Sequence, residues 1–233
     1  MHKKLELPPS ARSAEDQEAK APFPRFVMPK VLILDPELAR ALIVERQKKG
    51  IDKYDEVWEG VYVMPATASN AHQDLVYSLT VILGQVIGVP QHGRVQPGAN
   101  VSDRRKDWES SHRCPDIVVV LKGGRAIDCD THWFGGPDFL VEIQSPNDET
   151  DEKIPFYSRI GVRELLIIWR DTRQLRLFRH DGQQLTFVEP SDLEGQKWLV
   201  SEVVPLTFRR KASRANPRTE LRRTDGQDGS WIV

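Results

Sequence analysis

The chain has 233 residues, of which 39% are hydrophobic and 29% charged, enough apolar side chain for one generous domain or two small ones. Its 33 lysines and arginines are balanced by 34 aspartates and glutamates. A protein that coats nucleic acid without specificity usually has a large excess of basic residues, so this class is excluded. Two cysteines cannot form a disulfide scaffold, and the sequence shows neither a signal-peptide core nor an apolar run near the ~18 residues of a membrane helix. We therefore expect a soluble cytoplasmic protein without membrane contact, in which any nucleic-acid contact must come from a local patch.

Both ends of the chain have the composition of tails. Residues 1–30 are rich in proline, alanine, serine and charge, which disfavours a packed helix or core. From Arg209 to Val233 the apolar period disappears, and seven basic residues accumulate against three acids. We expect a disordered tail over 1–30, a folded domain over 31–208 and a solvated basic tail over 209–233. The alternative for this last segment is a weak arm that attracts phosphate.

Three segments have the start signals, stop signals or apolar spacing that are typical of helices. The first lies between Asp35, an N-cap residue followed by proline, and Gly50, a typical helix stop. The third runs from about Asp151 to Arg159 and ends before Gly161. The second runs from Asn70 to near Gly88, because its apolar residues form one stripe at helical spacing: Leu75, Leu79, Ile82, Leu83 and Val86.

Short segments between the helices have the pattern of strands. Ile117–Leu121 and Leu165–Trp169 are nearly continuous apolar runs, which is typical of strands covered on both faces. Leu175–Phe178 and Leu185–Val188 flank an Asp-Gly turn and predict a closing hairpin. Glu56–Met64 is expected to be the first member of another strand pair. The remaining predicted strands are Arg94–Val101, Asp116–Leu121, Asp138–Gln144 and Glu164–Trp169. This order predicts an α/β or α+β fold with a mixed central sheet flanked by helices.

Two carboxylates lie in segments that are otherwise suited to burial. Asp116 precedes an apolar strand, and Glu142 lies inside the strand FLVEIQ on the same face as Leu140 and Gln144. A buried carboxylate needs a cation, an ion-pair partner or a raised pKa. One Mg²⁺ would serve both groups, because this ion binds one or two protein carboxylates and completes its shell with water and phosphate oxygens. The alternatives are a turn aspartate and a glutamate paired with a core arginine or lysine.

A lysine completes this constellation. Lys153 lies in the first turn of the helix that follows the Glu142 strand, and a strand-to-helix reversal can return that turn to the strand's end. Its ammonium group could then reach a metal-bound water or the scissile phosphate. Tyr157 lies one turn later on the same helix face, where we expect it to pack or to orient Lys153. Without the two acids, Lys153 would be read as an ordinary exposed lysine.

In their order, these residues and their surroundings resemble the Uma2 family, also catalogued as DUF820, which belongs to the PD-(D/E)XK superfamily of restriction-endonuclease-like nucleases. The resemblance covers roughly Val31 to Leu206. No short motif is specific alone, but the combination is. It comprises Pro115-Asp116, Glu142-Ile143-Gln144, Ser145-Pro146, Lys153, Tyr157 and Gly161–Leu165, together with Trp58-Glu59-Gly60, Met64-Pro65 and His72.

The resemblance implies a restriction-endonuclease-like core and a phosphodiesterase that depends on Mg²⁺ or Mn²⁺. Asp116 and Glu142 would be metal ligands, and the backbone carbonyl of Ile143 a further ligand. Glu59 would be an additional early acid, the alternative being a residue that faces solvent on an edge strand. One departure concerns the lysine that usually follows the glutamate by two residues, a position occupied here by Gln144. Uma2-like sequences move that lysine to the following helix, here Lys153, which leaves Gln144 to orient a water.

The implied substrate is DNA, and alternatives remain open. Since Gln144 cannot neutralise charge, a catalytically inactive shell that binds nucleic acid or a protein partner is one alternative, and a purely structural protein is another. His72 has the position of a capping or surface histidine rather than a base. Analogy with the superfamily alone suggests a homodimer. Contacts to the DNA backbone are expected from a basic group whose alternative role is a solvated face: Arg94, Arg104, Arg105 and Lys106.

Overall fold

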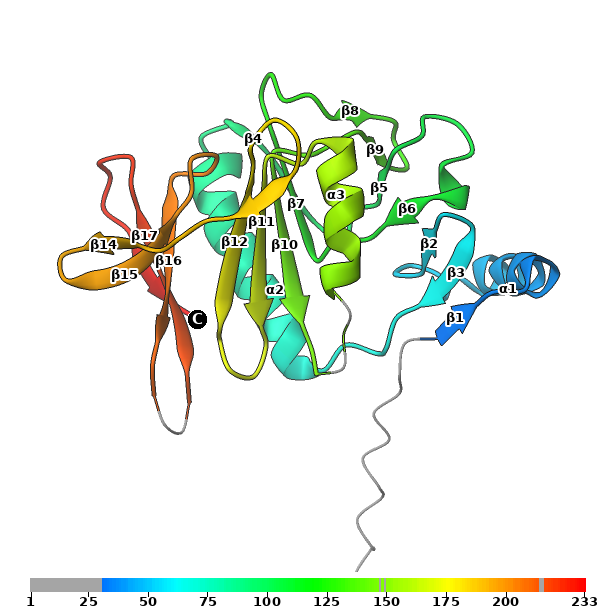
Figure 1. Cartoon of the computed structure of the whole chain (residues 1–233), viewed down its shortest axis with the longest axis horizontal. Helices are drawn as coiled ribbons and strands as arrows, with labels where there is room; N and C mark the ends of the chain where they lie inside the picture. The colour runs from blue at the N-terminus through cyan, green and yellow to red at the C-terminus, as the bar shows by residue number, and fades with distance from the viewer. Residues whose placement is uncertain (1–30, 147, 149, 214–215) are drawn as a thin grey trace, which may run out of the picture.

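The computed structural model describes residues 31–146, 148, 150–213 and 216–233, so the expectation for residues 1–30 lies outside the described residues. The described strands form three sheets. A central sheet stands between an N-terminal sheet on one side and a C-terminal sheet on the other (Figure 1).

The central sheet has six strands in the order β13-β12-β11-β10-β7-β4. Strands β10 and β11 are parallel, and every other neighbouring pair is antiparallel. The predicted α+β class with a mixed central sheet is therefore confirmed. The strands are β4 (Gly93–Pro97), β7 (Ile117–Leu121), β10 (Phe139–Gln144), β11 (Glu164–Trp169), β12 (Leu175–His180) and β13 (Leu185–Phe187).

Helices cover both faces of this sheet (Figure 1). Helix α2 (Asn70–Leu83), which continues into a π-helical turn (Gly84–Gly88), packs against Val141 and Ile143 of β10. Helix α3 (Ile154–Ile160) follows a 3₁₀ turn (Thr150–Lys153) and packs against Leu140 on the other face. Strand alternation therefore turns Glu142 toward the α3 side. Within the described residues, no helix combines the length and apolar character needed to cross a membrane.

The N-terminal sheet has the order β1-β3-β2-β6-β5-β9-β8, with helix α1 (Pro36–Lys49) beside it. The expectation that Glu56–Met64 forms one strand is wrong. Glu59 and Gly60 both adopt positive φ and form a two-residue turn, so the segment is a hairpin of two strands. Arg94–Val101 likewise divides at Gly98 between two sheets. The strands are β1 (Val31–Ile33), β2 (Glu56–Trp58), β3 (Val61–Met64), β5 (Val101–Ser102), β6 (His112–Arg113), β8 (Ile127–Asp128) and β9 (Trp133–Phe134). A 3₁₀ turn (Trp108–Ser110) precedes β6.

The expectation of a solvated tail over 209–233 is wrong for its described part, which belongs to a five-stranded antiparallel sheet. Phe208 and Leu221 of this sheet lie in the main core, against the same face that α2 covers. Its arginines are accommodated because Arg209 pairs with Glu220 and stacks over Trp198. The strands are β14 (Ser191–Leu193), β15 (Gln196–Val200), β16 (Leu206–Lys211), β17 (Arg218–Arg223) and β18 (Ser230–Ile232).

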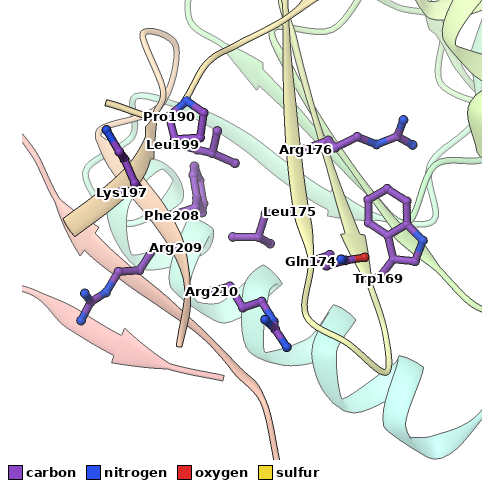
Figure 2. Close-up of a pocket in the computed structure, with 10 residues that line it drawn as sticks. All are labelled: Trp169, Gln174, Leu175, Arg176, Pro190, Lys197, Leu199, Phe208, Arg209 and Arg210. Atoms are coloured by element: carbon purple, nitrogen blue, oxygen red, sulfur yellow. The ribbon is translucent and has the colours of Figure 1, made fainter. Parts of the chain in front are cut away.

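An open groove of about 500 Å³ separates the C-terminal sheet from the end of the β11–β12 hairpin (Figure 2). Trp169 and Arg176 line one side of this groove, and Lys197, Arg209 and Arg210 line the other. Both rims therefore carry cationic side chains, with apolar residues such as Phe208 between them.

Candidate active site

Asp116 lies where strands β7 and β10 stop pairing. The antiparallel register of β7 and β10 ends at the pair Ile117–Val141, and beyond it the Ile143 amide donates to Asp116 Oδ2 over 2.7 Å. The other oxygen, Oδ1, lies 2.9 Å from His72 Nε2 in the first turn of α2. These two contacts fix the carboxylate beside the C-terminal end of β10.

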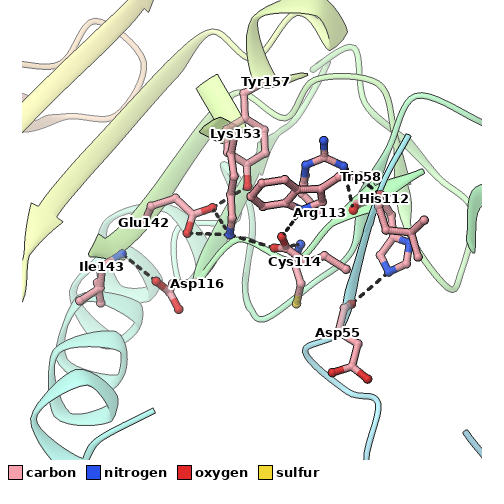
Figure 3. Close-up of polar contacts among 12 residues, drawn as sticks. Asp55, Trp58, His112, Arg113, Cys114, Asp116, Glu142, Ile143, Lys153 and Tyr157 are labelled. Carbon is pink, nitrogen blue, oxygen red and sulfur yellow. Dashed lines mark hydrogen bonds and ion pairs between the residues drawn. The ribbon is translucent and has the colours of Figure 1, made fainter. Parts of the chain in front are cut away.

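Glu142 lies on the next strand and is almost fully buried, with 3% of its surface exposed. The Tyr157 hydroxyl donates to its Oε1 over 2.5 Å, and Lys153 Nζ lies 3.2 Å from the same oxygen (Figure 3). Helix α3 thus supplies Tyr157, and the turn before it supplies Lys153, as the sequence predicts.

A third carboxylate, Glu56 of β2, belongs to this cluster and was not predicted. Lys153 Nζ lies 2.8 Å from Glu56 Oε1, a shorter contact than the one to Glu142. The Cys114 amide and Trp58 Nε1 also donate to Glu56, over 2.9 and 2.6 Å. The N-terminal sheet therefore contributes an acid to a site whose other groups come from the central sheet.

The pKa values of the two glutamates move in opposite directions. Burial raises the pKa of Glu142 to about 8, with Asp116 and Glu56 adding to the effect and Lys153 opposing it. Glu56 is just as buried, but Lys153 and the Cys114 and Trp58 donors lower its pKa. Despite burial, the two glutamates hold the pKa of Lys153 well above its usual range. One ammonium group thus serves two buried carboxylates, and Glu56 retains the charge more readily.

The donor atoms around Asp116 suit a hard divalent cation. Arg170 N donates to the Gln144 carbonyl, and because carbonyls alternate along a strand, the Ile143 carbonyl is directed to the Asp116 side. Gln144 Oε1 is buried and accepts no hydrogen bond from the described residues, so it could accept one from a water of a hydrated ion. Within the described part, no group of three or more His, Cys, Asp and Glu side chains is arranged as a metal site. Mg²⁺ usually takes one or two protein carboxylates, and Asp116 and Glu142 would be two groups of this kind.

Gln144 and His72 take supporting positions in this arrangement. Gln144 Nε2 donates to the Asp148 carbonyl over 2.9 Å, so the side chain is held on the face that also carries Glu142. Burial disfavours charge on His72, but its hydrogen bond with Asp116 raises its pKa. We infer that His72 holds Asp116 in place, and the sequence-based role of a surface histidine is wrong because its side chain is largely buried against that acid.

The structure places Glu59, the predicted early acid, away from Glu142 and Lys153. Glu59 occupies the turn of the β2–β3 hairpin and is half exposed, 3.2 Å from Arg113 Nη2 and 2.7 Å from Arg159 Nη2. It therefore faces two arginines, whereas Glu56 faces Lys153. The alternation of side chains along EVWE does not show which of Glu56 and Glu59 faces the interior, because that depends on where the turn lies.

Exchanging each of these acids for glutamine should separate their roles. Glu59→Gln is expected to change stability by less than about 1 kcal/mol and to leave divalent-ion affinity unchanged, because it loses only partly exposed ion pairs. Glu56→Gln removes a buried negative charge beside Lys153 and should weaken Mn²⁺ binding measured by calorimetry. A weakening in Glu59→Gln equal to that in Glu56→Gln would contradict this assignment.

The basic residues predicted to contact DNA do not gather around this cluster. Arg94 pairs with Asp128 on β8, and Arg104 contacts Asp103 and Ser110. Arg105 stacks over Phe134 in the N-terminal sheet. Lys106 is exposed in the same loop as Arg104 and Arg105. No contact joins these four residues to Asp116, Glu142 or Lys153 in the described part, so their role in DNA binding stays a prediction.

The fold and the site define an α+β protein with four charged residues at one end of a mixed sheet. These residues, here called the acid–lysine cluster, are Glu56, Asp116, Glu142 and Lys153. Residues 36–213 match the sequence model of Uma2, described as "Putative restriction endonuclease". The match spans most of the chain, which therefore belongs to the Uma2 family, and the predicted resemblance is confirmed.

One solved structure similar to this chain is described as "a putative nuclease belonging to DUF820 from Anabaena variabilis ATCC 29413". The similarity has a TM-score of 0.47 and 18% sequence identity, and it covers 60% of this chain and 79% of that one. No curated protein matches the chain.

Proposed function

We propose that this member of the Uma2 family is an endonuclease that hydrolyses DNA phosphodiester bonds with Mg²⁺ or Mn²⁺. Asp116, Glu142 and the Ile143 carbonyl would hold the ion. The observation that carries the proposal is the convergence of two carboxylates from adjoining strands with Lys153 from the next turn. The chemistry such an ion supplies is a lower pKa for a bound water and compensation of charge on the phosphate.

The side chains around these ligands have distinct tasks in this proposal. His72 and the Ile143 amide hold the Asp116 carboxylate, and Tyr157 and Lys153 orient that of Glu142. The Lys153 ammonium group keeps its proton at neutral pH and contributes positive charge near the reacting phosphate. We expect Gln144 to orient a water through its unpaired Oε1.

One observation favours a second candidate, a nuclease-like shell that binds nucleic acid or a protein partner without cleaving it. Lys153 is fully engaged by Glu56 and Glu142, and the position where the superfamily usually has lysine holds Gln144. If Lys153 serves only to neutralise these acids, the site retains shape without catalysis. A homodimer and a cytoplasmic location stay predictions in either case.

Calorimetric titration with Mn²⁺ tests the proposed function. Asp116→Asn should lose one binding event and all divalent-dependent plasmid nicking, because the amide keeps the hydrogen bonds but lacks the charge. Asp138→Asn is the matched control, since Asp138 also accepts a strand amide, from Leu121 over 2.8 Å, and pairs with Arg163. If the wild type binds no Mn²⁺, or if both variants lose binding equally, the metal-dependent nuclease is refuted and the second candidate gains.

A further inference from the structure

The β11–β12 turn meets strand β16 beside the groove of Figure 2. The β11–β12 turn comprises residues 170–174, and Arg210 of β16 donates from Nε to the Thr172 carbonyl over 2.7 Å. Arg210 also lines the groove, opposite Trp169 and Arg176. The C-terminal sheet is thereby joined to the central sheet at a position rich in arginine.

Several cations at this junction have no carboxylate partner among the described residues. Lys211 and Arg218 stand directly opposite each other in the β16–β17 register, where like charges are unfavourable. Arg173 lies in the adjoining turn, and its Nη1 is buried without an acceptor from the described part of the chain. Burial and the nearby charge of Arg218 lower the pKa of Arg173. This arrangement accumulates positive charge that the described residues compensate only in part, through the charge of Asp171 near Arg173.

Acidic side chains nearby are already committed to other cations. Asp171 pairs with Arg170, and Asp151 pairs with Arg176. Glu220 is shared by Arg209 and Arg222 on the C-terminal sheet. The excess charge around Arg173, Lys211 and Arg218 is therefore available to an external anion.

The backbone at Arg173 provides an independent indication. Its φ is +55°, in the left-handed region where glycine is favoured and a long side chain is uncommon. The turn closes through Arg173 N to the Trp169 carbonyl and Trp169 N to the Gln174 carbonyl, contacts that glycine at position 173 could also make. The arginine side chain is thus present where folding alone favours its absence.

The same turn touches the candidate active site. Arg170 N donates to the Gln144 carbonyl over 2.9 Å, and Arg170 Nη1 lies 3.1 Å from Ser69 Oγ and 3.5 Å from Ser145 Oγ. Strands β10 and β11 end at this edge, and the turn of the β11–β12 hairpin lies beside them (Figure 1). A polyanion bound at the hairpin junction could therefore extend to Asp116 and Glu142.

We propose that Arg173, Arg210, Lys211 and Arg218, here called the basic strip, bind the phosphate backbone of duplex DNA that flanks the bond to be cleaved. The inference rests on the proposed function, since it assigns the substrate a path from the acid–lysine cluster to the C-terminal sheet. It gives the positive charge of Arg210, Lys211 and Arg218 a recognition role within a folded sheet. Groups that bind several phosphates make affinity strongly dependent on salt.

The test measures affinity for a fluorescent DNA duplex in EDTA at several salt concentrations, using the full chain. The triple variant Arg173→Gly, Lys211→Gln, Arg218→Gln should lose at least about tenfold in affinity, and its slope of log affinity against log salt should fall by about 2–3, at about 0.9 per lost phosphate contact. The matched control removes three exposed charges from helix α1, in Arg40→Gln, Lys48→Gln, Lys49→Gln, and should keep the wild-type slope.

Arg173→Gly alone separates folding from binding. Glycine accepts the positive φ, so the thermal midpoint should equal or exceed that of the wild type while duplex affinity falls. Unchanged affinity in the strip triple variant, or equal losses in the two triple variants, would overturn the inference. Loss of affinity in the strip variant with no metal-dependent cleavage by the wild type would refute the endonuclease and leave the strip standing. Normal DNA affinity in the strip variant, with cleavage by the wild type that Asp116→Asn abolishes, would refute the strip and leave the endonuclease standing.

Discussion

Glu142→Gln is expected to abolish divalent-dependent cleavage of plasmid DNA, with a loss of about 10²–10³-fold or more, while the protein remains folded. The amide has the shape of the carboxylate and can still accept hydrogen bonds from Tyr157 and Lys153. It lacks the negative charge that a hard cation requires, so the site loses one of two carboxylate ligands. Nicking of supercoiled plasmid with Mg²⁺ or Mn²⁺, followed on a gel, measures the effect.

The difference in stability between this variant and the wild type depends on pH. The pKa of Glu142 is raised from 4.5 to about 8 by burial and by the neighbouring acids, so between these values the folded chain holds a proton that the unfolded chain has released. Wild-type stability therefore falls as pH rises through this window, whereas glutamine does not titrate. At pH 8 the variant should unfold at the same temperature as the wild type or higher.

A second buried glutamate provides the control. Glu164 is fully buried on β11 and is held by Arg179, Ser201 and the Glu202 amide, outside the acid–lysine cluster. Glu164→Gln should reduce stability but preserve cleavage per folded molecule. Cleavage by Glu142→Gln at the wild-type rate would show that the nicking activity does not arise at this site.

The central sheet and most of its site could be predicted because the signals are local. Uninterrupted apolar runs identify β7, β10 and β11, and a charged residue inside such a run must be compensated. This signal identifies Asp116 and Glu142 as candidate site residues. Lys153 and Tyr157 followed from helical spacing after the β10 strand, and the structure places both side chains against Glu142.

Glu56 was missed because its burial depends on a partner far away in the sequence. Its strand has only three residues, and the turn at Glu59-Gly60 decides which acid faces inward. Nothing in EVWEG indicates that Lys153, almost a hundred residues later, lies against it. Only packing of the N-terminal sheet against the central sheet reveals the third acid.

The C-terminal sheet was missed for a different reason. Alternation in LTFRRK and RTELRR is concealed by arginine, which is normally read as solvated. In the structure, the guanidinium groups of Arg209 and Arg222 lie 4.6 and 4.7 Å from the centre of the Trp198 ring and cover it. Arginine side chains therefore pack at positions where the alternation of a strand would normally have apolar residues. A composition rule that counts arginine as exposed cannot recognise such a strand.

Lys153→Met should destabilise the fold by about 3–5 kcal/mol at pH 8, because it leaves two buried carboxylates without their shared cation. Urea unfolding measures this loss. The control is Lys49→Met, which removes an exposed pair with Glu45 one turn away and should leave the free energy of unfolding almost unchanged.

The double variant Lys153→Met, Glu56→Gln distinguishes a structural lysine from a lysine that also serves the reaction. With Glu56 neutralised, Glu142 can take up a proton, and most of the lost stability should return. Cleavage should stay absent, because the positive charge near the phosphate is missing in both variants. Recovery of cleavage together with stability would mean that Lys153 acts only by compensating the two acids, whereas wild-type stability of Lys153→Met would contradict the buried contacts themselves. Stability and cleavage measured on these variants therefore decide whether Lys153, in the turn before α3, takes over the catalytic role of the lysine that the superfamily usually has at the position of Gln144.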